Sequence, residues 1–370
     1  MQINKLLTEK KEIENFLQSK LKSDQIAVDI EFMRRNTFFP EPCVIQISDG
    51  KNHACIDLTL DLNYKKIFQE IFSENKIIIM HSCRQDLEIL NLILGYIPKN
   101  IFDTQFAASF LGYKYQIGYA EIIKLIFDVD IDKTEKMTNW KKRPLSSEQI
   151  LYALNDVIYL NKLHNNLFNE LKKTNKLEYF FEEFKNYIED IEWDPSSEFA
   201  WKRLKSINKL DPKVRSIAKI ISVWREKKAI ELNLPRNWVL LEKDIIEVSK
   251  KFNEDNVINL PIKKNSLNIE KFSIEIEDEI KNFSLDKKSD TKKNKKNKPQ
   301  GEYKKVVDEL YEYYKNISIK NKISYQIFSP KKMILNYVKN PNKESKLING
   351  WRKKLIDTKK ISLITKSLSD

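Results

Sequence analysis

The first part of the chain contains short β-forming runs that do not recur later. Residues 26–30 (IAVDI), 43–48 (CVIQIS) and 53–58 (HACIDL) are separated by polar or turn-forming residues, which predicts three neighbouring strands. A fourth apolar run, KIIIM at 76–80, follows a helical pattern near 64–74. Strands first and then alternating helices predict an α/β or α+β domain with a mixed sheet. The later helical patterns lie near 83–94, 104–111, 118–127 and 147–170.

After residue 190 the strand pattern almost disappears. Residues 197–255 predict three or four amphipathic helices, and residues 302–368 predict another small helical domain. Between them, Lys287–Lys298 carries seven lysines, one aspartate and no apolar residue, which predicts a flexible linker. A chain of 370 residues is too long for one ordinary core, so we expect several domains. The boundaries we predict are 1–190, 191–284, a linker at 285–300, and 301–370.

The charge is distributed unevenly along the chain. The formal net charge is +13, yet residues 1–170 hold 21 basic and 23 acidic residues, a net charge of −2. Residues 171–370 hold the remaining 45 basic and 30 acidic residues, a net charge of +15. Lysine-rich coding bias alone would not separate the two parts in this way, so we expect the second part to bind a polyanion.

Cysteine usage and hydropathy indicate where in the cell the protein is expected. The three cysteines, Cys43, Cys55 and Cys83, form an odd set without metal-type spacing, which indicates a reducing compartment. No apolar run approaches the roughly 20 residues of a membrane span, and the amino terminus lacks the apolar stretch of a secretory signal. We therefore expect a soluble, cytoplasmic protein with no membrane association and no evident protein partner.

Four carboxylates fall in three separate segments. Asp29 and Glu31 occupy positions i and i+2 of a predicted strand, so their side chains share one face. Asp86 lies off the apolar stripe of the helix at 83–94, and Tyr152 and Asp156 lie one turn apart on a later helix. Each pattern alone is more often a solvated surface. Together, carboxylates from distant segments repel unless a cation lies between them, which points to a pair of divalent metal ions and phosphoryl chemistry.

These residues lie in segments that resemble the ribonuclease D family. The family belongs to the 3′-5′ exonucleases with an Asp-Glu-Asp-Asp quartet, and this chain has the tyrosine of the tyrosine subtype. The resemblance spans essentially the whole chain. It implies a ribonuclease H-like mixed sheet flanked by helices, followed by two small all-α HRDC-type domains, a nucleic-acid-binding module also found in helicases. The segments are VDIEFMRRNTFFPEPCVIQIS, HSCRQDLEIL, IFDTQFAASFLGY, DKTEKMTNWKKRPLSSEQILYALNDVIYL, WKRLKSINKLDP, VWREKKA and, more weakly, NGWRKKLI.

The resemblance implies a role for each site residue. Asp29, Glu31, Asp86 and Asp156 are expected to hold two divalent ions, Mg²⁺ or Mn²⁺, because an oxygen-only ligand set disfavours Zn²⁺. Tyr152 takes the place of the residue that orients the attacking water. A phenol releases its proton only near pH ~10, so we expect orientation of the water and not proton abstraction.

Further residues are candidates for RNA contact, although each also has a structural explanation. Trp140 either stacks on a base or packs in the core, and His81 either contacts RNA or caps a strand. The Lys141–Pro144 run adjoins SSEQ, which predicts a helix N-terminus with a capping box. The candidates for RNA contact are Gln46, His81, Lys133, Trp140, Lys202, Arg203 and Lys205.

The function that we expect is that of a metal-dependent 3′-5′ exoribonuclease. It would trim 3′ extensions of tRNA precursors and other structured RNAs and release 5′-mononucleotides by a two-metal-ion mechanism. A DNA 3′-5′ exonuclease is an alternative, and a noncatalytic RNA-binding protein is a second one. The sequence has no Gly-Lys-Ser/Thr phosphate loop of a helicase.

Overall fold

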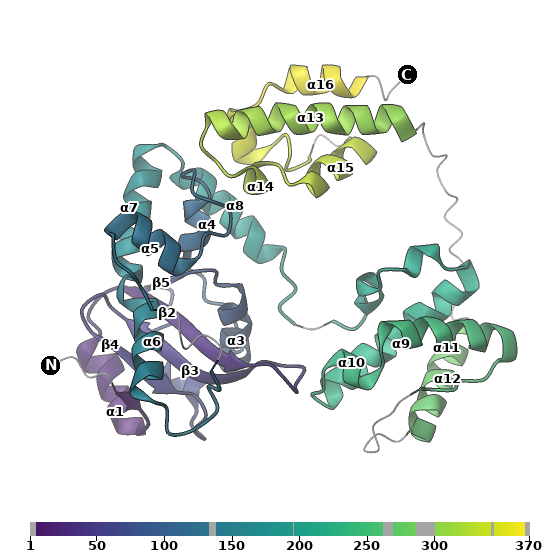
Figure 1. The fold of residues 1–370 in the computed structure, drawn as a ribbon, viewed down its shortest axis with the longest axis horizontal. Coiled ribbons are helices and arrows are strands. Elements are labelled where there is room, and N and C mark those ends of the chain that lie inside the picture. Colours follow the sequence, from purple (N-terminus) through teal and green to yellow (C-terminus); the bar gives the residue numbers. More distant parts are fainter. Residues whose placement is uncertain are drawn as a thin grey trace. The chain divides into compact units, whose positions relative to one another are not determined.

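The chain folds into a sheet-containing domain followed by helices (Figure 1). The computed structural model describes residues 5–132, 138–194, 196–261, 269–285, 300–341 and 344–366. The strands are β1 (Leu6–Leu7), β2 (Gln25–Met33), β3 (Glu41–Ser48), β4 (His53–Asp57), β5 (Ile77–Met80) and β6 (Ile101–Asp103). They form one sheet in the order β1-β4-β3-β2-β5-β6.

The sheet is mixed, as predicted. β3 pairs with β4 in the antiparallel direction, whereas β1 with β4, β2 with β5, and β5 with β6 pair in parallel. The apolar residues that suggested the strands are buried in the core, among them Ile26, Ile45 and Ile79. The predicted fold class, a mixed sheet flanked by helices and followed by a helical region, is confirmed.

Helices connect the strands and continue the first domain. The long helix predicted at 147–170 is two helices with a turn at Tyr159, a break that no glycine or proline marks in the sequence. Of the helix predicted at 64–74, only the first turn is helical, because residues 68–76 form turns. The helices are α1 (Lys10–Asn15), a π-helical turn (Phe16–Lys20), α2 (Tyr64–Ile67), α3 (Arg84–Leu94), α4 (Thr104–Ala108), α5 (Tyr119–Phe127), α6 (Ser147–Ile158), α7 (Leu160–Lys173) and α8 (Leu177–Glu189).

Beyond residue 190, the described residues contain helices and no strand. Pro212 occupies the first position of α9, where proline is favoured because the N–H that it lacks has no partner within the helix. The elements are 3₁₀ turns at Ala200–Arg203 and Ile207–Lys209, α9 (Pro212–Glu231), α10 (Arg236–Val239), α11 (Glu242–Asp255), α12 (Ile269–Leu285), α13 (Gln300–Lys320), α14 (Tyr325–Phe328), α15 (Lys331–Lys339), a 3₁₀ turn at Gly350–Lys354, and α16 (Thr358–Lys366). Among the described residues, none of the helices is both long enough and apolar enough to cross a membrane.

The described residues divide into two compact units. The first joins Met1–Phe32 and Pro42–Ile191 with Lys295–Asp370. The second joins Met33–Glu41 with Glu192–Asn294. The predicted linker lies almost entirely outside the described residues, and the predicted four-part division of the chain stays a prediction.

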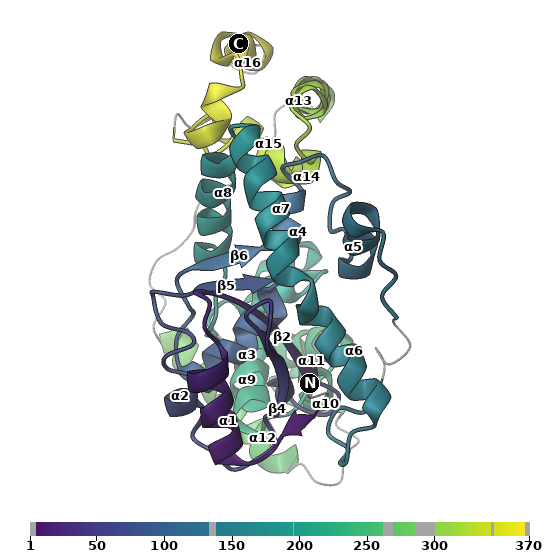
Figure 2. The ribbon, with the colours of Figure 1, turned by 90° about the vertical axis from the view of Figure 1, so that its left-hand side faces the viewer.

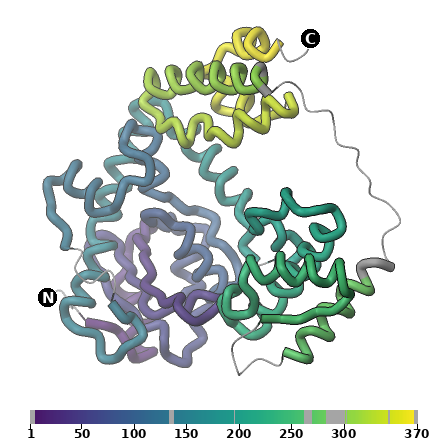
Figure 3. Tube along the Cα trace, turned by 45° about the vertical axis from the view of Figure 1, so that its right-hand side comes forward, coloured from purple at the N-terminus to yellow at the C-terminus, as the bar shows by residue number. Residues whose placement is uncertain are grey.

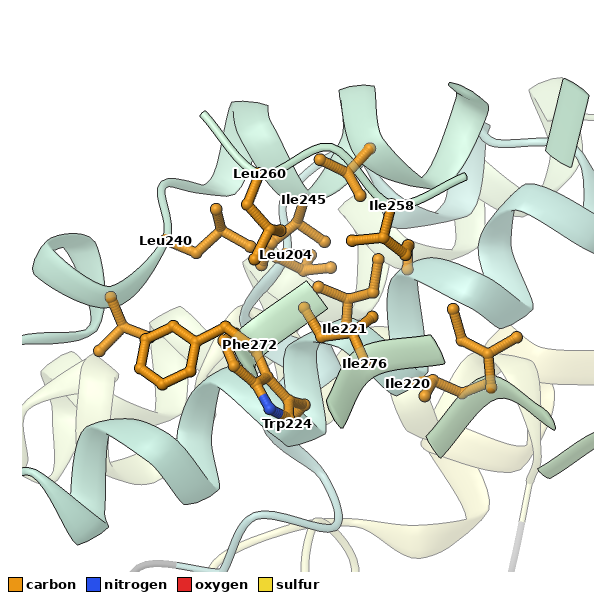
Figure 4. Packing of buried hydrophobic residues seen from close by; sticks show 14 of the residues in the cluster. Leu204, Ile220, Ile221, Trp224, Leu240, Ile245, Ile258, Leu260, Phe272 and Ile276 are labelled. Atoms are coloured by element: carbon orange, nitrogen blue, oxygen red, sulfur yellow. The ribbon is translucent and has the colours of Figure 1, made fainter. Parts of the chain in front are cut away.

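The second unit has its own hydrophobic core (Figure 4). Trp224 and Ile221 of α9 pack there with Phe272 and Ile276 of α12. Phe38, which comes from the connection between β2 and β3, belongs to the same cluster. This membership explains why residues 33–41 group with the helices of the second unit.

In the first unit, the helices of the C-terminal module (α13 to α16) lie at the end of α8 (Figures 1 and 3). The Trp351 ring stacks on Tyr179 of α8 at 5.4 Å between centroids, and its Nε1 donates to Glu183 at 2.8 Å. Ser324 N donates to Ser109 O at 2.6 Å, so the module also joins the segment after α4.

Candidate active site

Strand β2 presents two carboxylates on one face of the sheet. Asp29 and Glu31 are partly exposed, whereas the intervening Ile30 is buried on the opposite face, as the two-residue period of a strand requires. One ligand atom from each of Asp29, Glu31 and Asp156 lies within 4.8 Å of the others. The structure therefore brings Asp156 to the two carboxylates of β2, although Asp156 follows Glu31 by 125 residues along the chain.

Helix α6 supplies Tyr152 and Asp156. The helix begins with the predicted capping box, in which Ser146 Oγ accepts from Gln149 N at 3.2 Å and Gln149 Oε1 accepts from Ser146 N at 2.8 Å. α6 packs against β4 and runs beside the strands (Figure 2). This fixed start sets the rotation of the helix, and with it the face on which Tyr152 and Asp156 lie one turn apart.

The phenol of Tyr152 lies in the field of the carboxylates. Its pKa is raised by burial and then by the negative charges of Asp156, Glu31 and Asp29, listed by decreasing effect. The hydroxyl is consequently protonated at neutral pH and able to donate a hydrogen bond. The Trp140 ring lies beside it, with 6.1 Å between the ring centroids.

Asp86 enters the site from α3. It is 7% exposed, and its pKa is raised well above the ordinary value by burial and then by the charges of Asp29 and Glu31. It lies outside the 4.8 Å cluster of three carboxylates. Asp86 is therefore close enough to interact electrostatically with the cluster without being part of its tightest contact.

The start of α3 is fixed by a second aspartate, Asp103, which ends β6. Its carboxylate accepts from Ser82 N at 3.1 Å and from Cys83 N at 2.8 Å, directly before the helix. The same carboxylate caps α4 by accepting from Gln105 N at 2.8 Å and Phe106 N at 3.0 Å. Asp103 thus positions the helix that carries the site carboxylate, although the sequence had given it no role.

Burial and repulsion dominate the electrostatics of the cluster. The pKa of Asp29 is raised to about 6, because the surrounding protein withdraws its carboxylate from water although the residue as a whole keeps some exposure. Carboxylates gathered in this way are stabilised by a cation, and the three that lie within 4.8 Å could hold one.

Two further side chains border the cluster and were missed by sequence reasoning. The Tyr119 hydroxyl donates to Asn155 O at 3.1 Å, and its pKa is raised by burial and then by the charge of Asp156. The buried Cys55 thiol lies 3.8 Å from Ile150 O, and its pKa is raised by burial and then by Asp29. Both positions depend on how α5, α6 and β4 pack, for which the sequence carries no local pattern.

Three candidates for RNA contact are engaged or buried within the sheet domain. Gln46 is 0% exposed and Trp140 is 2% exposed, so neither offers a surface to RNA. His81 Nδ1 contacts Thr104 Oγ1 at 2.8 Å and Nε2 contacts Ile117 O at 2.9 Å, which leaves neither ring nitrogen for RNA. Burial and internal hydrogen bonding therefore replace direct RNA contact as the interpretation for these residues. Lys133 lies outside the described residues.

The remaining candidates lie in the second unit. Lys202 and Lys205 are exposed, and Lys202 Nζ lies 3.8 Å from the centroid of the Phe199 ring. Arg203 is also exposed, but its guanidinium pairs with the fully buried Glu226 at 3.3 Å. The two lysines therefore retain accessible charge, whereas part of the charge of Arg203 serves the protein itself.

The comparisons with known proteins agree on one family. Residues 4–172 match a family model described as 3′-5′ exonuclease. Ribonuclease D of Bartonella henselae is 32% identical over 271 residues, which cover 73% of this chain and 66% of the relative. Ribonuclease D of Desulfotalea psychrophila is 31% identical over 252 residues, which cover 67% of each chain. The matched stretch spans less than two thirds of the length of several curated relatives, for example 64% of ribonuclease D from Sphingobium indicum.

A solved structure extends the likeness to the helical region. The crystal structure of Escherichia coli RNase D superposes with a TM-score of 0.82 over 98% of this chain and 99% of that chain, at 23% identity. This similarity shows a shared fold across both the sheet domain and the helices. With the family-model match and the relatives, it leads to one conclusion: the chain belongs to the ribonuclease D family of 3′-5′ exonucleases.

Proposed function

We propose that this chain is a metal-dependent 3′-5′ exoribonuclease that shortens RNA from its 3′ end and releases 5′-mononucleotides. The observation that carries the proposal is the convergence of Asp29, Glu31 and Asp156 within 4.8 Å beside the protonated phenol of Tyr152. Membership of the ribonuclease D family supports the same activity.

The donor set fits a hard divalent cation. Carboxylates supply only oxygen atoms, which suit Mg²⁺ or Mn²⁺ better than Zn²⁺. Burial raises the pKa of both Asp29 and Asp86, and nearby positive charge would offset that cost. We assign Asp29, Glu31, Asp86 and Asp156 as the residues that would hold two ions. When bound, such ions supply positive charge for the attacking water and for the leaving 3′ oxygen.

The chain's own groups hold the water and the substrate in place. We infer that Glu31 accepts a hydrogen bond from the attacking water, while the Tyr152 hydroxyl fixes the direction of its approach. Tyr152 is not the base, because burial and the neighbouring carboxylates raise the pKa of its phenol further above neutrality. Asp86, outside the tight cluster, acts through an intervening water.

The substrate we propose is structured RNA, with 3′-extended tRNA precursors as the first choice. Escherichia coli RNase D is described as an exoribonuclease involved in structured RNA processing, and its fold matches this chain. The net charge of +15 on residues 171–370 supports binding of RNA phosphates by the helical region. Binding should then weaken steeply as the salt concentration rises.

We further propose the domain organisation that we predicted from the sequence. Residues 1–190 form the exonuclease domain, 191–284 and 301–370 form two HRDC-type domains, and 285–300 link them. The exposed Lys202 and Lys205 belong to the first of these helical domains and would contact phosphates. We place the protein in the cytoplasm, where RNA precursors are available.

One assay tests this proposal against its alternatives. A 3′-extended tRNA, a single-stranded RNA and a DNA strand are each incubated with the full chain in Mg²⁺, Mn²⁺ or chelator. We expect stepwise 3′ shortening of RNA with either metal and none with chelator. Preference for DNA would favour a DNA exonuclease, and binding without cleavage would favour a noncatalytic RNA-binding protein.

A further inference from the structure

The Gln46 side chain is buried in β3 without a hydrogen-bond partner. Its exposure is 0%, and neither Oε1 nor Nε2 meets a partner in the described part of the chain. No other side chain in these described ranges has two such atoms. Leaving a buried polar group unpaired costs about 1–3 kcal/mol, so an amide with two donor hydrogens and two acceptor lone pairs is expensive to keep here.

Gln46 faces the side of the sheet that carries the carboxylates. It pairs with Cys55 of β4 in antiparallel register, and residues opposite each other in such a pair place their side chains on the same face. The Cys55 thiol lies 3.8 Å from Ile150 O of α6, and the charges of Asp29 and Glu31 act on it. The unpaired amide therefore lies on the face of the sheet that α6 covers, which is also the face of the candidate carboxylates.

A second unpaired donor borders the same turn of α6. Trp140 is buried, and its Nε1 has no hydrogen-bond partner within the described residues. Its ring lies 6.1 Å from that of Tyr152, which follows Ile150 by two positions on the helix. Gln46 and Trp140 thus have three unpaired polar atoms between them, and each residue neighbours a side chain that touches or belongs to α6: Cys55 for Gln46 and Tyr152 for Trp140.

Buried polar groups without protein partners usually bind an ordered water, which makes about three hydrogen bonds. We propose that Gln46 and Trp140 hold one buried water that in turn fixes the Tyr152 hydroxyl. Trp140 Nε1 donates to the water, Gln46 Oε1 accepts from it, and the second hydrogen of the water points to Tyr152 Oη. Gln46 is then a positioning residue for the proposed hydrolysis, on which this inference rests.

The water hypothesis makes an unusual prediction for Gln46→Met, which keeps the length of the side chain and removes its polar atoms. If the amide served only the fold, removing it would change stability and leave the rate constant intact. If it orients Tyr152 through water, kcat falls about 10-fold while KM and the melting temperature change little. The matched control is Ile47→Val, one residue along β3 on the opposite buried face, which should lower stability slightly and leave kcat unchanged.

The kinetics of double variants test whether Gln46, Trp140 and Tyr152 act through the same water. Trp140→Phe should also lower kcat, and the double variant with Gln46→Met should be no slower than the slower single variant, because both lose the same water. In a Tyr152→Phe background, Gln46→Met should have no further effect. A crystal structure of the wild-type protein should show a water within about 3.2 Å of the Gln46 amide.

Several results would overturn the inference. These are an undiminished kcat in Gln46→Met, a loss of kcat that is matched by a fall in melting temperature, full additivity with Tyr152→Phe, or a crystal structure in which the amide pairs directly with protein. Failure of the proposed function is distinguishable, because the wild-type protein would then leave RNA intact while the water could still be seen at Gln46.

Discussion

The Arg352 guanidinium and the Glu183 carboxylate form a two-armed ion pair, with Nη1 and Nη2 each 2.7 Å from a carboxylate oxygen. Arg352 is 1% exposed and also donates to Phe328 O at 2.7 Å and Ile327 O at 2.8 Å. The pair joins the C-terminal module to α8 within the first unit. A charge buried this deeply makes its partner essential.

Glu183→Ala should release the C-terminal module. Removing the carboxylate leaves the buried Arg352 guanidinium without its counter-charge, which we expect to cost about 3–5 kcal/mol. Limited proteolysis should then cut the segment around α13 to α16 while the sheet domain stays protected. The control is Lys346→Ala, which removes the exposed ion pair with Asp190 at 2.9 Å. That change should cost less than about 1 kcal/mol, and equal proteolysis of the two variants would contradict the prediction.

The ion pair between Asp57 and Arg143 should make stability depend on acid pH. Burial alone would raise the pKa of Asp57, but hydrogen bonds from Arg143 and Thr59 outweigh it, so the pKa lies below its ordinary value of 3.8. A lowered pKa contributes stability that is present above pH 3.8 and is lost as pH falls through the folded-state value. Asp57→Asn should therefore destabilise the protein by about 1.5–3 kcal/mol at pH 7, and by less at pH 3. Urea unfolding of both proteins at the two pH values would test this, and a pH-independent difference would contradict it.

Asp29→Asn should separate repulsion from metal binding. Without metal, removing one negative charge from the cluster relieves repulsion, so the variant should melt at a temperature equal to or above that of the wild type. With Mg²⁺ at about 100 times its dissociation constant, a bound ion should stabilise the wild type by about 2.7 kcal/mol, whereas the variant gains little. Calorimetry with and without Mg²⁺ measures both effects.

Asp29→Asn and Asp156→Asn should also lower the rate of RNA hydrolysis more than about 100-fold while the protein stays folded. The control is Asp61→Asn, which changes an exposed carboxylate outside the cluster. Retained activity in folded Asp29→Asn protein would refute the assignment of this residue.

Tyr152→Phe should impair hydrolysis without abolishing it. The variant loses the hydroxyl that we propose orients the water but retains the four carboxylates, so we expect a fall in kcat of about 10-fold with KM little changed. Because our proposal gives the phenol no part in proton transfer, the pH profile of kcat should keep its shape. Single-turnover kinetics from pH 6 to pH 9 tests this, and a lost limb of the profile would show that Tyr152 transfers a proton.

Asn233 should be required to hold residues 33–41 in the second unit. Its Oδ1 accepts from Phe38 N and Phe39 N, both at 3.1 Å, and its φ of 48° is left-handed. Asn233→Gly loses the acceptor and keeps the backbone freedom, whereas Asn233→Ala loses the acceptor and adds about 1–2 kcal/mol of strain. Hydrogen exchange at the Phe38 and Phe39 amides should rise in both variants, and Asn233→Ala should be the less stable of the two. Unchanged exchange would contradict the role of Asn233.

Local patterns predicted much of the fold. The apolar runs at 26–30, 43–48, 53–58 and 76–80 contain or overlap β2, β3, β4 and β5, and the SSEQ pattern gave the capping box of α6. β1, two residues long, and β6, three residues long, were not predicted as strands. Strands this short depend on pairing with β4 and β5, which lie far along the chain.

In the candidate site, too, some features were predicted from the sequence and others depend on three-dimensional packing. The order of the motifs predicted that carboxylates from β2 and α6 would converge, and the structure brings Asp29, Glu31 and Asp156 together. The burial of Gln46 was not predicted, and for Trp140 the sequence left core packing and base stacking open, because the packing of α6 decides which side chains next to the site are accessible. The pairing of Arg203 with Glu226 likewise requires the three-dimensional arrangement of α9.

The membership of Phe38 in the core of the second unit has a practical consequence for dissecting the protein. A truncation after residue 191 would keep the β2–β3 connection but remove the rest of the cluster to which Phe38 belongs, and also Arg236, which lies over the Phe38 ring at 4.4 Å. The isolated sheet domain would then carry exposed aromatic residues at the tip of a hairpin, which favours aggregation. Isolating the sheet domain therefore requires polar replacements at Phe38 and Phe39, and any exchange of helical regions among relatives must exchange this tip with them.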